Sequence, residues 1–111
     1  MYYSIHTLLD AHQNELVALC QQYRVRRLYV FGSLIKGTFD RQRSDLDFLA
    51  QLADRIPNRE YADRFLGLEV GLHEVFKFPV DLLTVEGLKN AGFRQRVEET
   101  RALVYESDNA L

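Results

Sequence analysis

Residues 31–47 read FGSLIKGTFDRQRSDLD and connect two apolar segments through a glycine-containing turn. Before the turn, Leu28 to Phe31 form a continuous apolar run, which is typical of a strand covered on both faces. After it, residues 45–52 alternate at first between polar and apolar side chains, which predicts a second strand. The stretch therefore predicts a strand, a turn and a second strand that carries two aspartates near its start.

The flanking sequence adds helices and a third strand. Apolar residues recur at helical spacing over residues 4–23 and again over 61–76, where Asn58 is placed to cap the second helix. Residues 80–84 predict a third strand after Pro79. A helical stretch should then open at residue 84 or 86 and break near Gly92, and a second should cover 93–102; residues 103–105 fit either a last strand or that helix's end. The expected fold class is α/β (α+β), a small mixed β-sheet with helices packed on it.

Length and composition are those of an ordinary globular protein. The 111 residues predict a single domain, 1–111, with 47% hydrophobic and 27% charged residues. A net charge of −2 argues against direct nucleic-acid binding. Because the sequence has neither a membrane-length apolar run nor a recognisable signal peptide, we expect no membrane association and a cytoplasmic location. The single cysteine, Cys20, excludes an intrachain disulfide and is expected to be a small apolar core residue.

Gly32 and Ser33 follow the first predicted strand and precede a short helical stretch. Glycine lets a ligand approach the backbone closely, and the first N–H groups of a helical turn attract anions. Ser33 can cap that turn or donate its hydroxyl to a phosphate, and Lys36 adds a positive charge one turn later. The pair by itself fits an ordinary strand-to-helix turn as well as a phosphate site.

Asp45 and Asp47 are two residues apart on a predicted strand, so their side chains leave the same face. Their repulsion raises one pKa unless a cation lies between them, and Mg²⁺ prefers such oxygen ligands. Asp81 interrupts the apolar run of the third strand, where a charge is costly unless it is paired or metal-bound. If the third strand pairs with the second, three carboxylates can hold two metals, and a two-metal site suits in-line displacement at phosphorus. The alternative is a strand end with solvated aspartates.

With these motifs together, the chain resembles the minimal nucleotidyltransferases of the DNA polymerase β-like superfamily. The resemblance rests on FGS, SDLDFL and FPVDLLT and extends from the first helix to residues 101–107. It implies the polymerase β-like nucleotidyltransferase fold. It also implies that Gly32 and Ser33 bind the nucleotide's phosphates, that Asp45 and Asp47 bind metal, and that Asp81 is the third metal-binding and catalytic carboxylate.

The resemblance implies an activity and a partner. Members transfer a nucleoside monophosphate from a metal-bound nucleoside triphosphate and release pyrophosphate. Small members are often antitoxins paired with a HEPN ribonuclease and can transfer AMP to a tyrosine of that toxin. We therefore expect Mg²⁺ (two ions), ATP as donor, and a HEPN-domain protein as acceptor. The alternatives are a non-catalytic antitoxin that neutralises a HEPN partner by covering it, and a transferase acting on a small molecule such as an aminoglycoside. Self-association is left open.

Basic residues near these motifs allow more than one interpretation. Leu34 and Lys36 stand where many members of the family have arginines, and lysine keeps the charge but not the bidentate fork. Arg41 and Arg43 can steer a triphosphate or be solvated loop charges. The basic cluster at residues 24, 26 and 27 is expected in a solvent-facing turn before the first strand.

Overall fold

The computed structural model describes residues 5–32, 45–53, 59–88 and 90–107 of the chain. Asn58, the expected cap of the long helix, lies outside these residues. The helices and strands follow one another as α1 (Ile5–Ala11), α2 (Gln13–Gln22), β1 (Val25–Phe31), β2 (Leu46–Leu52), α4 (Arg59–Phe76), β3 (Val80–Thr84), the short 3₁₀ helix η1 (Val85–Gly87), α5 (Ala91–Thr100) and β4 (Ala102–Glu106).

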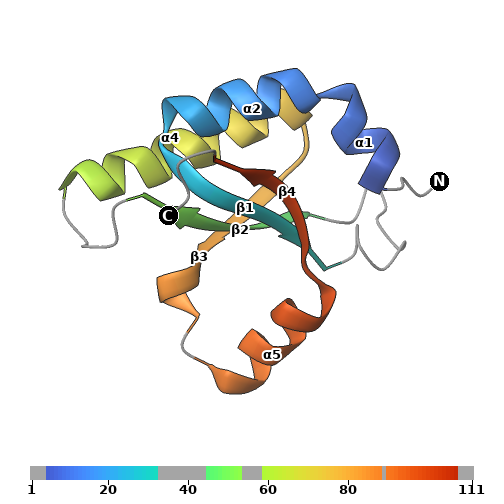
Figure 1. Ribbon diagram of the computed structural model, residues 1–111, viewed down its shortest axis with the longest axis vertical. Helices are drawn as coiled ribbons and strands as arrows, with labels where there is room; N and C mark the ends of the chain where they lie inside the picture. The colour runs from blue at the N-terminus through green and yellow to red at the C-terminus, as the bar shows by residue number, and fades with distance from the viewer. Residues whose placement is uncertain (1–4, 33–44, 54–58, 89, 108–111) are drawn as a thin grey trace.

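The four strands form one mixed sheet in the order β3-β2-β1-β4. Strand β1 pairs antiparallel with both β2 and β4, whereas β2 and β3 are parallel. A parallel pair needs a crossover connection, and α4 provides it. Helices α2 and α4 lie together on one side of the sheet and α5 lies on the other (Figure 1). The expected mixed sheet with packed helices is confirmed.

The main core lies between the sheet and the helices α1, α2 and α4. Phe48 and Leu28 from the strands and Leu68 from α4 are completely buried in it. Helix α4 approaches α2 closely through two glycines one turn apart, since a methyl group at Gly67 would overlap the ring of Tyr23. A methyl group at Gly71 would likewise overlap a methyl group of Leu19 on α2.

A second, smaller core lies on the α5 side of the sheet. Its buried residues come from β1, β2, the segment after η1, and α5: they are Phe31, Leu49, Leu88 and Val97. Side chains of β1 therefore enter both cores, with Val30 in the main core and Phe31 in the smaller one. This agrees with the expectation, drawn from its continuous apolar run, of a strand covered on both faces.

The expectation of one helix over residues 4–23 is wrong, because the chain breaks between α1 and α2 at His12. The backbone there has φ −125° and ψ 20° instead of helical angles. The His12 Nδ1 atom lies 3.0 Å from Glu15 Oε2, and the ring packs edge-on against Phe76 of α4 at 5.3 Å between centroids. The break is thus accompanied by a tertiary contact with α4, which local helical periodicity does not reveal.

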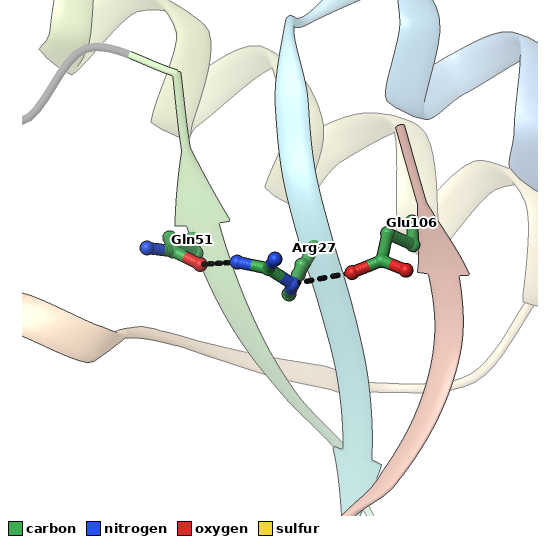
Figure 2. Close-up of polar contacts among 3 residues, drawn as sticks. All are labelled: Arg27, Gln51 and Glu106. Carbon is green, nitrogen blue, oxygen red and sulfur yellow. Dashed lines mark hydrogen bonds and ion pairs between the residues drawn. The ribbon is translucent and has the colours of Figure 1, made fainter. Parts of the chain in front are cut away.

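The expected solvent-facing basic turn before the first strand holds for Arg24 but is wrong for Arg26 and Arg27, since β1 already begins at Val25. Arg27 lies within this central strand and connects its two neighbours (Figure 2). Its Nε donates to Glu106 Oε2 of β4 at 2.6 Å, and its Nη1 donates to Gln51 Oε1 of β2 at 3.0 Å. The side chain therefore links three strands.

The C-terminal third resolves the alternatives left by the sequence. Residues 103–105 belong to β4 and not to the end of a helix. The expected helical stretch after β3 is only the 3₁₀ turn η1, where Thr84 Oγ1 accepts from the Gly87 N–H. Helix α5 starts two residues earlier than expected because Asn90 caps it, accepting from the Phe93 N–H at 2.9 Å.

Candidate active site

The parallel pairing of β2 with β3 brings two of the predicted aspartates together. Asp47 on β2 and Asp81 on β3 are direct register partners, so their side chains leave the same face of the sheet. The Leu46 N–H donates to the Pro79 carbonyl at 2.8 Å, which fixes this register at the start of both strands. Asp45 precedes β2 by one residue and is exposed. The condition that the third strand lies beside the second is met.

Gly32 lies at the end of β1, next to Asp47 on β2. Its φ of +78° is in the left-handed region that favours glycine. A Cβ at this position would overlap Asp47 Oδ2. Gly32 is therefore needed both for its backbone conformation and for the space that the Asp47 carboxylate occupies, in addition to the ligand approach expected from the sequence.

The electrostatic cost of the cluster falls on Asp47. Burial, and then the charges of Asp81 and Asp45, raise the pKa of Asp47 from 3.8 to about 6. Asp81 itself is exposed, so the expectation that its charge is costly in an apolar strand is wrong. Leu82, on the opposite face of β3, enters the main core, whereas Leu83, on the same face as Asp81, packs against the smaller core.

The three aspartates suit a divalent cation by their chemistry. Within the described ranges, no three Asp, Glu, His or Cys side chains converge closely enough to hold a metal as they stand. The carboxylates do lie close enough to repel the charge on Asp47. Mg²⁺ prefers hard oxygen ligands, and its charge would relieve the repulsion between these carboxylates, so the residues fit such an ion.

Several predicted phosphate-binding residues are not among those that the structure describes. Ser33 and Lys36 lie in the segment 33–44, outside the described residues, as do Leu34, Arg41 and Arg43. Their roles stay predictions from the sequence. Gly32 is the one residue of the predicted phosphate-binding set whose position the structure gives.

Sequence reasoning missed a cavity of about 530 Å³ beside Asp47. Phe31, Gly32 and Asp47 contribute its sheet side, and α5 contributes the facing wall with Phe93, Arg96, Val97, Glu99 and Thr100. A larger cavity, about 740 Å³, lies near the start of β1 and the end of β4, away from the aspartates. We assign the site to the smaller cavity because it contains the perturbed carboxylate. The charged residues of α5 did not indicate this cavity in the sequence, since charged residues on a helix usually face solvent.

The mixed sheet, with carboxylates paired across adjacent parallel strands, has the fold of the polymerase β-like nucleotidyltransferases. Residues 16–104 match the family model of the nucleotidyltransferase domain, and the chain belongs to this family. No curated protein is similar enough in sequence to count as a match. None of the helices in the described residues is sufficiently long and apolar to cross a bilayer.

Solved structures with this fold include a protein assigned to the minimal nucleotidyltransferases. It is 26% identical, with 90% of this chain and 95% of the other covered and a TM-score of 0.63. A chain from a toxin–antitoxin crystal structure with AMP-PNP is 22% identical over 86% of this chain and 74% of its own, with a TM-score of 0.65. A chain from the complex of a tri-AMPylated Shewanella oneidensis HEPN toxin with its MNT antitoxin is 18% identical, covering 88% and 72%, with a TM-score of 0.56. At these identities the last two show a shared fold.

Proposed function

We propose that this protein is a Mg²⁺-dependent nucleotidyltransferase that transfers AMP from ATP to a hydroxyl group of a HEPN-type partner protein. The observation that carries the proposal is the register pairing of Asp47 with Asp81, with Asp45 next to them, in a chain of the nucleotidyltransferase family. Burial, and then the charges of Asp81 and Asp45, raise the pKa of Asp47, and a cation bound beside it would relieve this cost, which supports the proposed metal site.

Each residue then has a stated role. Asp45, Asp47 and Asp81 would hold Mg²⁺, which when bound offsets the charge of the triphosphate and acidifies an attacking hydroxyl. Gly32 leaves room for the Asp47 carboxylate, and with Ser33 it would bind the phosphates. The exposed Asp81 would take the proton of the acceptor hydroxyl. The acceptor oxygen forms a bond to the α-phosphorus. The bond between this phosphorus and the oxygen that bridges the α- and β-phosphates breaks, and pyrophosphate leaves with the electron pair.

The position of Asp81 supports a macromolecular acceptor. It lies on β3, the last strand of the sheet on its side, and its side chain is exposed. An acceptor can therefore approach from beyond the sheet edge without entering a narrow cleft. The toxin–antitoxin complexes among the structures with this fold, one of them containing an AMPylated HEPN toxin, support a HEPN protein as that acceptor.

The test is transfer of AMP measured by intact-mass spectrometry. The purified protein is incubated with Mg²⁺ and ATP, with and without a HEPN-domain protein encoded beside it. We expect one or more AMP units on the partner with the wild type and none with Asp47→Asn. Asp10→Asn, the same change at an exposed position of α1, is the matched control and should transfer normally. A stable complex without added mass would refute the transferase and favour a protein that acts by binding alone.

A further inference from the structure

The cavity beside Asp47 lies on one particular side of the carboxylates. Across the sheet, Asp81 is on β3, Asp47 on the neighbouring β2, and Gly32 at the end of β1. The described residues that line the cavity include Gly32 and Asp47 but neither Asp45 nor Asp81. The cavity is therefore on the β1 side of Asp47, beside Gly32, and away from the sheet edge that carries Asp81.

The size and lining of the cavity suit a nucleotide. Its volume of about 530 Å³ is within the range of small-ligand pockets, roughly 300–1,000 Å³. Its apolar wall includes Phe93, whose ring is fixed edge-on against Phe31 at 6.4 Å between centroids. Polar groups from α5 complete the wall, so an apolar surface and charged groups face the same space.

The three arginines of α5 and its C-cap differ in what they contact. Arg94 pairs with Glu98 at 3.7 Å, and the guanidinium of the capping Arg101 lies over the ring of Tyr29 at 4.4 Å. Arg96 lines the cavity and makes no ion pair with any residue in the described ranges. The other charged residue of this wall, Glu99, accepts a hydrogen bond from Gln95 at 3.1 Å. The guanidinium of Arg96 is thus available to an anion in the cavity.

We propose that this cavity is the donor-nucleotide pocket and that Arg96 binds a phosphate group of the nucleoside triphosphate. The inference rests on the proposed nucleotidyltransferase function and adds a residue of α5 to the phosphate contacts. Its chemistry is that of a planar guanidinium, which matches phosphate oxygens with two parallel hydrogen bonds. Arg96 would supply from α5 a guanidinium fork of the kind that Lys36 cannot provide.

The test is a binding measurement that does not depend on catalysis. The affinity for a non-hydrolysable ATP analogue with Mg²⁺, and for pyrophosphate with Mg²⁺, is measured by isothermal titration calorimetry. Arg96→Ala should weaken binding of the analogue about ten-fold or more, as expected for a charge-assisted hydrogen bond. Arg96→Lys should fall between the alanine variant and the wild type. Arg94→Ala, on the same helix but paired with Glu98, is the control and should bind within about two-fold of the wild type.

The outcomes separate the two proposals. If the wild type binds the analogue and Arg96→Ala binds it equally well, the role of Arg96 is refuted while the proposed function stands. An equal loss in Arg94→Ala would also refute it, because the effect would then come from the charge of α5 in general. If the wild type binds neither probe, both proposals fail. The exposed position of Arg96 lets its variants fold, which their thermal unfolding would verify.

Discussion

Replacing Asp47 by asparagine should stabilise the folded protein at neutral pH in the absence of metal. Burial and the charges of Asp81 and Asp45 raise the pKa of Asp47 from 3.8 to about 6. The folded state therefore binds this proton more tightly than the unfolded state. The stability that this bound proton gives the folded state is fully present at low pH and is lost as the pH rises from about 4 to 6. Above pH 6 the ionised Asp47 carboxylate destabilises the fold.

The magnitude follows from the same values. The rise from 3.8 to about 6 is a difference of about two pKa units, equivalent to roughly 3 kcal/mol. Because Asp47 is only half-buried, solvent screening reduces this to ~1–2 kcal/mol. Asparagine has nearly the same shape and no charge, and it should recover most of that free energy of unfolding at pH 7.5.

Urea denaturation of the wild type and Asp47→Asn at pH 7.5 and pH 4, with EDTA present, measures the effect. We expect the variant to be more stable at pH 7.5 and most of the difference to disappear at pH 4. Asp10→Asn, at an exposed position, should change the free energy of unfolding little at either pH. A variant that is no more stable than the wild type at pH 7.5, or equally stabilised at both pH values, would refute the reasoning.

Three further predictions concern packing and reactivity. Gly71→Ala should lower the free energy of unfolding by about 1–3 kcal/mol, because the added methyl group would overlap Leu19. Gly92→Ala, in the first turn of α5, would make only ordinary contacts and should raise the free energy of unfolding by up to about 1 kcal/mol. Thermal denaturation of the two variants tests both values. Arg27→Met should cost about 1 kcal/mol in urea denaturation, since both bonds to the neighbouring strands are partly exposed, and an unchanged midpoint would mean that they contribute nothing. Burial raises the pKa of the Cys20 thiol to about 12, so a thiol reagent at pH 8 should modify it only after unfolding, and rapid modification of the native protein would contradict its burial.

Much of the fold could be predicted because its signals are local. The apolar run ending at Phe31, the alternation that starts at Asp45 and the run VDLLT each identified a strand, and the periodicity before Phe76 identified α4. The features that sequence reasoning missed depend on contacts between distant segments. His12 interrupts a helical pattern and packs on Phe76, and Arg27 belongs to a strand where it meets Glu106.

The candidate site shows the same division. Asp45, Asp47 and Asp81 were predicted as candidates from the sequence, together with the strand pairing that would bring them together, and the structure pairs two of them, Asp47 and Asp81. Sequence reasoning assigned the electrostatic cost to Asp81, whereas the half-buried residue is Asp47, because burial depends on which flank of the sheet is covered. Arg96 was missed since its place on the cavity that Asp47 also lines depends on how α5 packs on the sheet (Figure 1).

The separation of the two cores has a consequence for local motion. Helix α5 contributes a single buried side chain, Val97, to a small cluster, while α1, α2 and α4 pack on the opposite face of the sheet. Opening of α5 would expose this cluster and leave the main core intact. The amide hydrogens of α5 should therefore exchange through local opening, with a free energy well below that of global unfolding. Amides in the centre of β1 and β2 should exchange only on global unfolding. The α5 wall of the cavity would then open more easily than the strands that carry Asp47 and Asp81, which gives a ligand a path in without disturbing those strands.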